Sequence, residues 1–186
     1  MKRLFDFALA CLLATVLLLP LALLALAVRL SSNGPILYWS ERVGRHNATF
    51  KMPKFRSMNV GTPVVATHLL DNAQAHLTPI GGFLRRSSLD EFPQLWNILK
   101  GEMSFVGPRP ALFNQYDLIE LRSAHGVDTL LPGLTGWAQI NGRDELPISQ
   151  KVALDFEYLK KKSFWFDLKI IMLTVLKVAS RDNVAH

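Results

Sequence analysis

Two adjacent carboxylates, Asp90 and Glu91, are the residues of this chain best suited to carry chemistry. They lie between an arginine pair, Arg85 and Arg86, and a Gly-Pro-Arg-Pro segment that contains Arg109. An ionised carboxylate can bind Mg²⁺, act as a base or attack phosphorus as a nucleophile. Carboxylates among arginines therefore indicate phosphate and divalent-metal chemistry. One carboxylate would attack phosphorus, and both could serve as metal ligands. Acidic residues in a first helical turn are also often only caps.

The element that must position these carboxylates is a helix with two candidate starts. Ser88, three residues before Glu91, matches a capping box, but Pro93 would then break a backbone hydrogen bond. A start at Asp90 instead puts Pro93 in the first turn, where proline is tolerated. Both registers place Asp90 at the positive end of the helix dipole, which favours the ionised carboxylate.

Arg109 is preceded and followed by proline, in the sequence Gly107-Pro108-Arg109-Pro110. Proline restricts the backbone on both sides of the arginine and so fixes where its guanidinium lies. A fixed guanidinium can bind two phosphate oxygens at once. The other interpretation is a rigid loop with a solvated arginine.

The chain has 186 residues, which suffices for one domain with a modest core and an added element. Its formal net charge is +6, and the first 60 residues carry all of this excess, with eight basic and two acidic residues. Anionic lipid headgroups would attract such basic residues by about 1 kcal/mol each near a membrane surface. The basic residues are not interleaved with aromatic ones, which argues against nucleic-acid binding. Cys11 is the only cysteine, so no disulfide forms within the chain.

Residues 8–28 form an uncharged apolar segment that is long enough to cross a bilayer as a helix. A cleaved signal peptide is one interpretation, and a straight span is a second. Basic residues flank both ends, so the positive-inside rule sets no orientation. Pro20 lies near the middle and would kink the helix, which allows a third interpretation, a re-entrant helix that returns to the same side.

The rest of the chain is predicted to be α/β, mostly helical with one short β-hairpin. Two strands, residues 36–40 and 49–52, flank a turn signal at residues 44–47. The other predicted elements are a surface loop at 59–79, helices at 111–125 and 151–162, a Gly-rich loop at 131–139, and an apolar helix at 163–179. The last helix carries three charges, so we expect it to be amphipathic and to lie at a membrane interface or against the core.

The sequence resembles the bacterial sugar transferases, also called monotopic phosphoglycosyl transferases. Residues 87–110, SSLDEFPQLWNILKGEMSFVGPRP, look like the core signature of that family. Further similar blocks follow the family order over nearly the whole chain, at residues 2–6, 34–44, 54–58, 132–143 and 165–170. Several long blocks in order are more specific than one short motif.

The resemblance implies an enzyme that transfers a sugar 1-phosphate from a UDP-sugar to a polyprenol phosphate, undecaprenyl phosphate in this family, and releases UMP. Such a reaction initiates glycoconjugate or polysaccharide assembly. The resemblance also implies a re-entrant membrane helix at residues 1–30, followed by a catalytic domain at residues 31–186. That domain would face the cytoplasm at the bacterial inner membrane. Mg²⁺ is the implied cofactor, and a homodimer is possible in this family.

The resemblance also assigns roles to single residues. Asp90 would attack the sugar-proximal phosphorus and form an aspartyl-phosphosugar intermediate, with Glu91 beside it in contact with metal or phosphate. Substrate-contacting roles fall to a larger set of residues: Lys54, Arg56, Arg85, Arg86, Arg109, Trp137, Arg143 and Asp155. Trp137 would either stack on a base or pack. One departure is Leu19-Pro20, where family members often have Ser-Pro, so water or Thr15 must replace the serine or the break is less sharp.

Two other functions fit the same residues. A membrane-anchored Mg²⁺-dependent phosphatase would act on the same anions but release its product into solution. A membrane-anchored scaffold of a polysaccharide assembly system would not depend on Asp90. The sequence leaves the sugar open, with a lean towards N-acetylated or deoxyamino sugars from the block around residues 141–147.

Overall fold

The computed structural model describes residues 1–63, 72–142 and 146–179. Its larger sheet has the antiparallel order β2-β1-β4, with β1 at Leu37–Val43, β2 at Thr49–Phe55 and β4 at Ala111–Leu112. A second sheet pairs β3 (Ser104–Val106) in parallel with β5 (Gly133–Thr135). The predicted hairpin is therefore confirmed, with strands longer than the sequence indicated.

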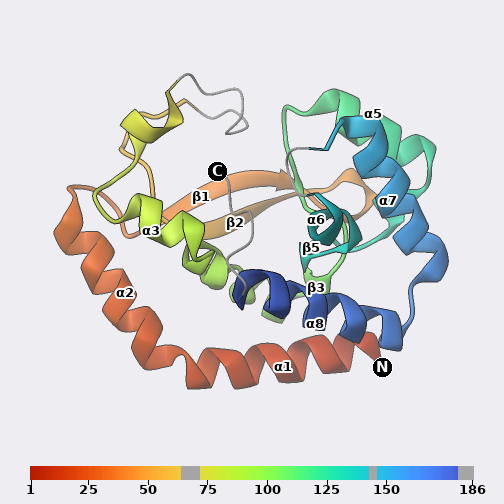
Figure 1. Ribbon diagram of the computed structural model, residues 1–186, viewed down its shortest axis with the longest axis horizontal. Coiled ribbons are helices and arrows are strands. Elements are labelled where there is room, and N and C mark those ends of the chain that lie inside the picture. Colours follow the sequence, from red (N-terminus) through yellow and green to blue (C-terminus); the bar gives the residue numbers. More distant parts are fainter. Residues whose placement is uncertain (64–71, 143–145, 180–186) are drawn as a thin grey trace.

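Helices make up most of the described chain, as predicted. The α-helices are α1 (Lys2–Val16), α2 (Leu18–Ser31), α3 (Gly81–Arg86), α4 (Leu95–Lys100), α5 (Tyr116–Ala124), α6 (Trp137–Asn141), α7 (Ile148–Lys161) and α8 (Phe164–Ala179). The 3₁₀ turns are η1 (Arg45–Asn47), η3 (Ala73–His76), η4 (Leu89–Gln94) and η5 (Val127–Thr129). In Figure 1, α1 and α2 form a bent edge along the bottom and left of the view, and α5 lies at the upper right.

Two predicted boundaries are wrong, and both errors come from tertiary pairing. The helix predicted at 111–125 starts only at Tyr116, because Ala111 and Leu112 pair with β1. The Gly-rich loop predicted at 131–139 contains β5 and the start of α6. A Cβ on Gly133 would lie 2.1 Å from the Gly107 nitrogen, so this glycine permits close approach of two strands. The helices predicted at 151–162 and 163–179 are confirmed as α7 and α8.

The apolar N-terminal segment is a bent pair of helices. α1 and α2 meet at Leu17 with a bend of 64°. Pro20 is the third residue of α2, in the first turn, where its missing N–H is tolerated. The Thr15 hydroxyl donates to the Cys11 carbonyl over 2.9 Å, so it is engaged within α1. In the described ranges no single helix is long and apolar enough to cross a membrane, whereas this bent pair has the length and composition of a broken span or a re-entrant loop.

Both ends of the bent pair are tied to the folded domain. At the start of α1, Lys2 Nζ lies 2.5 Å from Asp167 Oδ2 and donates to the Val106 carbonyl over 3.0 Å. At the end of α2, Arg56 donates to the Ser32 carbonyl over 2.7 Å and also binds the Asn33 carbonyl. The two ends therefore sit on one and the same domain.

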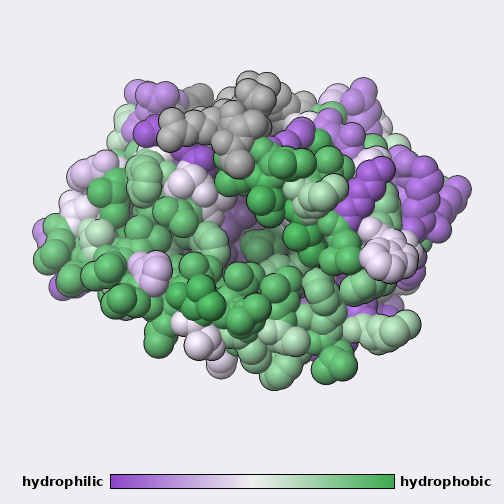
Figure 2. All heavy atoms as spheres, turned by 60° about the horizontal axis from the view of Figure 1, so that its bottom comes forward, coloured by the Kyte–Doolittle hydropathy of each residue, from purple (hydrophilic) through white to green (hydrophobic). Residues whose placement is uncertain are grey.

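The apolar residues divide between a packed interior and an exposed face. Inside, Ala10 of α1 packs in one cluster with Ile98, Met103 and Ile170, all of them fully buried. Burial of an aliphatic side chain of this size contributes about 1.5–3 kcal/mol, so this cluster fixes α1 and α8 on the domain. Outside, large side chains of α1, α2 and α8 stay exposed: Leu4, Leu12, Leu18, Leu19, Leu23, Leu26, Met172, Val175 and Leu176. Figure 2 shows this apolar face, which is hollowed near its middle.

Candidate active site

The two carboxylates lie on a 3₁₀ turn that packs against the end of β2. Ser88 precedes this turn at φ 56°, in the left-handed region, and its side chain makes no capping hydrogen bond. The predicted capping box is therefore wrong, since an N-cap needs an extended backbone at that serine. The second predicted start, an α-helix from Asp90, is also wrong, because η4 runs to Gln94 and α4 starts at Leu95. Pro93 lies inside η4 and favours this tight turn over a regular helix.

Glu91 is the centre of a compact charge cluster. Its Oε1 accepts a hydrogen bond from Lys54 Nζ at 2.7 Å and another from Arg109 NH2 at 3.0 Å. Burial by itself would raise the pKa of Glu91, but Arg109 and Lys54 outweigh burial and hold this pKa well below its usual range. Glu91 is therefore ionised at any physiological pH, and it fixes two cations at the bottom of the site.

Asp90 has the opposite electrostatic character. Only 7% of the residue is exposed, and burial raises the pKa of its carboxyl, as does the neighbouring charge of Glu91. Lys54, Arg85 and Arg109 act against this rise. A poorly solvated carboxylate surrounded by cations is a strong nucleophile towards an electrophile that those cations can hold.

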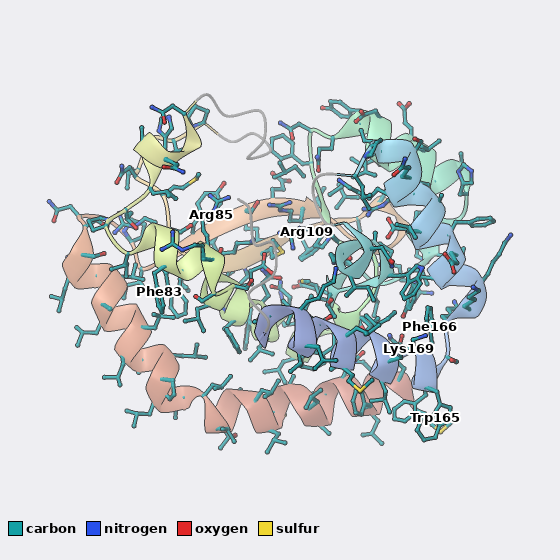
Figure 3. All side chains as sticks on the ribbon, viewed as in Figure 1. Phe83, Arg85, Arg109, Trp165, Phe166 and Lys169 are labelled. Carbon is teal, nitrogen blue, oxygen red and sulfur yellow. The ribbon has the colours of Figure 1, made fainter. Side chains whose placement is uncertain are left out.

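The two arginines of α3 differ in their surroundings. Arg85 is partly buried and close enough to Asp90 to affect its pKa, and Figure 3 shows Arg85 and Arg109 on the same side of the molecule, over the hairpin. Arg86 is exposed to solvent on the same helix. Of this pair, the structure brings Arg85 to the carboxylates.

The Gly107–Pro110 corner is held from behind by backbone hydrogen bonds. The Gly107 N–H donates to the Thr135 carbonyl and the Gly133 N–H donates to the Pro108 carbonyl, both over 2.9 Å. A Cβ on Gly107 would lie 2.3 Å from the Leu131 carbonyl oxygen, so glycine is required there. The backbone of this corner is therefore held in one position, from which the Arg109 side chain reaches Glu91.

Asp155 supports this corner and does not line the site. It is 1% exposed, and its Oδ2 accepts from Arg122 Nε at 3.0 Å and from Arg122 NH2 at 2.6 Å. Arg122 NH1 donates to the Arg109 carbonyl over 2.8 Å. Burial raises the pKa of Asp155, against the opposing effect of Arg122. The substrate contact predicted for Asp155 does not match this burial, and the pair positions Arg109 instead.

Two other predicted substrate residues, Arg56 and Trp137, are placed differently from Lys54. Arg56 is 5% exposed and binds the carbonyls after α2, so the phosphate contact predicted for it does not match its position. Trp137 donates from Nε1 to Glu157 over 3.0 Å and packs against Phe166, with ring centroids 5.1 Å apart, which matches the packing interpretation. Arg143 lies outside the described residues.

A cavity of about 480 Å³ extends from the charge cluster to helices α1 and α8. Glu91 and Arg109 line it at one end, and α1 and α8, with Leu17 at the end of α1, supply most of its apolar wall. Its volume falls in the range of small-molecule sites. The remaining lining residues are Leu13, Leu17, Ser87, Ser88, Phe92, Phe105, Leu134, Thr135, Gln139, Ile171, Thr174, Val175 and Val178.

Sequence reasoning assigned no role to Gln139, Thr135 or Thr174. Gln139 is 9% exposed, and within the described ranges neither its Oε1 nor its Nε2 has a hydrogen-bond partner. The signal that would have identified it is a glutamine between two apolar residues of the block Trp137–Asn141.

Asp90 and Glu91 can hold a divalent ion only together with other ligands. The described ranges contain no group of three or more metal-binding side chains. Mg²⁺ in phosphoryl-transfer sites is commonly bound by one or two carboxylates, with substrate phosphates and water as the remaining ligands. Asp90 and Glu91 fit that donor set, although Oε1 of Glu91 is already engaged by two cations.

Comparison with known proteins identifies the family of this chain. The family model described as bacterial sugar transferase matches residues 1–181. The UDP-glucose:undecaprenyl-phosphate glucose-1-phosphate transferase of Escherichia coli (strain K12) is 45% identical over 188 residues, which cover 95% of this chain and 40% of that protein. The undecaprenyl-phosphate glucose phosphotransferase of Komagataeibacter xylinus is 42% identical over 189 residues, which cover 94% of this chain and 35% of that protein.

A shorter relative has a similar length to this chain. The uncharacterized sugar transferase EpsL of Bacillus subtilis (strain 168) is 38% identical over 188 residues, which cover 99% of this chain and 90% of that protein. The chain thus spans two-fifths or less of the first two relatives and most of the third. By the match of the family model over nearly its whole length, this chain belongs to the bacterial sugar transferase family.

Proposed function

We propose that this protein transfers a sugar 1-phosphate from a UDP-sugar to a polyprenol phosphate and releases UMP. The observation that carries the proposal is that Glu91 and Arg109, the neighbours of Asp90 in the charge cluster, line one end of an apolar cavity that is walled by α1 and α8. A soluble anionic donor and a lipid-linked acceptor can both reach such a site. The names of the Escherichia coli and Komagataeibacter xylinus relatives, which specify undecaprenyl phosphate, support the same choice of acceptor.

The chemistry takes two steps at one phosphorus atom. A carboxylate oxygen of Asp90 attacks the sugar-proximal phosphorus, and the bond from that phosphorus to the bridging oxygen breaks, so UMP leaves with the electron pair. A phosphate oxygen of the acceptor then attacks the aspartyl-phosphosugar, and the bond to Asp90 breaks. Asp90 is regenerated as a carboxylate, and the product is a polyprenyl diphosphosugar. A covalent intermediate allows one small site to bind two bulky anions in turn.

The surrounding cations fit this sequence. Lys54, Arg85 and Arg109 lie where they can offset charge on the diphosphate and on the departing UMP. Asp90 and Glu91 would hold Mg²⁺ together with the donor diphosphate, and the ion would stabilise charge on the transferred phosphoryl group.

The membrane arrangement is part of the proposal. Residues 1–30 enter one leaflet and return to the same side, because both ends of the α1–α2 pair bind the same domain and the pair bends by 64°. The exposed apolar side chains of α1, α2 and α8 contact lipid, with Trp165 at the edge of the same face near the start of α1. The catalytic domain lies on the cytoplasmic side of the bacterial membrane, where UDP-sugars are made.

Intact-mass measurement of the detergent-solubilised protein tests the reaction. The protein is exposed to Mg²⁺ and a panel of UDP-sugars without lipid, beside Asp90→Asn and an EDTA-treated sample. We expect one donor to add the mass of a sugar phosphate to the wild type only, with release of UMP. The panel includes UDP-glucose and UDP-galactose, the sugars in the relatives' names, and UDP-N-acetylglucosamine.

The same experiment separates the competing functions. A phosphatase would release free sugar phosphate or inorganic phosphate and would leave no lipid-linked product once undecaprenyl phosphate is added. A scaffold would give neither adduct nor UMP, and Asp90→Asn would support polysaccharide assembly as well as the wild type does.

A further inference from the structure

Gln139 is a buried amide without a partner on the wall of the cavity. Within the described residues, neither its Nε2 nor its Oε1 makes a hydrogen bond, although the residue is 91% buried. A buried polar group left without a partner destabilises a fold, so such a group in a cavity wall points to a ligand that completes its hydrogen bonds. The side chain lines the same cavity as Arg109 and Glu91.

The amide lies near the charged end of that cavity. A Cβ on Gly136 would lie 2.6 Å from Gln139 Oε1 and 2.1 Å from the Gly107 carbonyl oxygen. Gln139 is therefore next to Gly107, two residues before Arg109. Its side chain lines the cavity together with Arg109 and with Thr174 and Val175 of α8.

Three of the four hydroxyl side chains that line the cavity already donate their protons within the protein; the fourth belongs to Ser88. Thr174 donates to the Ile170 carbonyl over 2.8 Å, so Thr135 must be the donor in the 2.7 Å contact between the Thr135 and Thr174 hydroxyls. Ser87 donates to the Phe83 carbonyl over 2.8 Å. Gln139 Nε2 thus offers N–H groups that none of these three hydroxyls can replace.

We propose that Gln139 binds the phosphate of the lipid acceptor and sets its position for attack on the aspartyl-phosphosugar. This inference rests on the proposed function. An ionised phosphate monoester accepts hydrogen bonds, and the two N–H groups of Nε2 donate them at the point where a lipid with its chain between α1 and α8 would place its headgroup. Gln139 then acts in the second step, and the donor step depends on Lys54, Arg85 and Arg109.

Gln139→Leu separates the two steps. A rapid-mixing assay with donor alone measures the burst of UMP, which reports the first step and also counts folded sites. A titration with undecaprenyl phosphate in detergent micelles measures the acceptor KM. We expect the acceptor KM to rise about 10- to 100-fold, the range for loss of a hydrogen bond to a charged group, while the burst rate changes less than about twofold. Gln139→Glu places a negative charge against the phosphate and should raise the acceptor KM further.

Gln94→Leu is the matched control. Gln94 is 2% exposed, and its Nε2 likewise has no partner in the described ranges, but it does not line the cavity. We expect both the acceptor KM and the burst rate per folded site to stay at their wild-type values in Gln94→Leu, even if this variant is less stable.

Two results would overturn the inference. An unchanged acceptor KM in Gln139→Leu would mean that the amide does not touch the acceptor. A slower burst, or a change in the preferred UDP-sugar, would assign Gln139 to the sugar of the donor instead. Failure of the proposed function is a separate result, because the wild type would then give no UMP burst with any donor.

Discussion

Two carboxylate–arginine pairs in this protein join the same kinds of group and have opposite consequences. Glu91 binds Arg109 at 3.0 Å beside an open cavity, and Asp155 binds Arg122 at 2.6 Å in the interior. One third of the Arg109 side chain is exposed, against 9% for Arg122. The first pair can rearrange around a ligand, whereas the second can only hold its neighbours in place.

The two pairs are also connected. The Arg109 side chain donates a hydrogen bond to Glu91, and the Arg109 carbonyl accepts one from Arg122 NH1. The buried pair therefore fixes the backbone from which the site arginine extends. Both are carboxylate–arginine ion pairs. Only Glu91 and Arg109 line the cavity and lie beside Asp90, and this position distinguishes the candidate site from the supporting pair.

The largest expected effect comes from removal of the proposed nucleophile, Asp90. Asp90→Asn should lower the transfer rate by at least about 10⁴-fold, because no carboxylate remains to form the covalent intermediate; this corresponds to about 5.4 kcal/mol. The protein should stay folded, with a thermal midpoint at pH 7 no lower than that of the wild type. The sign follows from linkage: the pKa of Asp90 is raised on folding, so ionisation of this group costs folding free energy at neutral pH, and asparagine avoids that cost. A variant that still released UMP with wild-type kinetics would remove Asp90 from the mechanism.

Disruption of the buried pair should cost stability first. Asp155→Ala leaves the Arg122 guanidinium buried without its carboxylate, and we expect a loss of about 3–5 kcal/mol in the free energy of unfolding. Thermal unfolding in detergent measures it. An unchanged midpoint would contradict the supporting role.

A double variant sharpens this comparison. Arg122→Met with Asp155→Leu replaces the pair by apolar side chains, which should recover most of the stability. The hydrogen bond to the Arg109 carbonyl is still lost, so the transfer rate of the folded protein should stay below that of the wild type. Recovery of both properties together would show that the pair does not position Arg109.

Glu91→Gln tests the cavity-lining pair, Glu91 and Arg109, through the pH dependence of the first step. The neutral side chain holds Lys54 and Arg109 less firmly, and we expect a loss of about 100-fold in rate, or about 2.7 kcal/mol. In the wild type, the first step should slow as the pH falls through the raised pKa of Asp90, since only the ionised form attacks. The charge of Glu91 contributes to that rise, so the acid limb of the burst rate should move to lower pH in Glu91→Gln. A limb that moves to higher pH would contradict this electrostatic account.

The sequence was a better guide to which charged residues the fold brings together than to the backbone that supports them. Asp90, Glu91 and Arg109 were identified because chemistry restricts which residue types can serve, and the hairpin because turn residues separate two apolar stretches. The capping box at Ser88 was wrong because the left-handed backbone there depends on how η4 packs on β2. Gln139 received no role because its lack of a partner is a property of the folded cavity.

Lys54 and Arg56 are the sharpest case of this difference. They are two residues apart, and the sequence predicted a phosphate contact for both. In the structure Lys54 Nζ binds Glu91, whereas Arg56 binds the chain after α2. The local sequence does not contain this distinction, because β2 ends at Phe55 and only the docking of α2 decides what Arg56 meets.

The smallest expected effects come from replacing these two residues, and they should differ in kind. Lys54→Met should lower the transfer rate about tenfold, or about 1.4 kcal/mol, with little change in the thermal midpoint. Arg56→Met leaves the Ser32 and Asn33 carbonyls without their donor and should destabilise the fold by about 1–3 kcal/mol. The UMP burst per folded molecule should then stay close to the wild-type value for Arg56→Met and fall for Lys54→Met. The opposite result would be an equal fall of the UMP burst in both variants with unchanged thermal midpoints. Arg56 would then be a phosphate ligand, and the end of β2 would belong to the active site and not to the supporting structure.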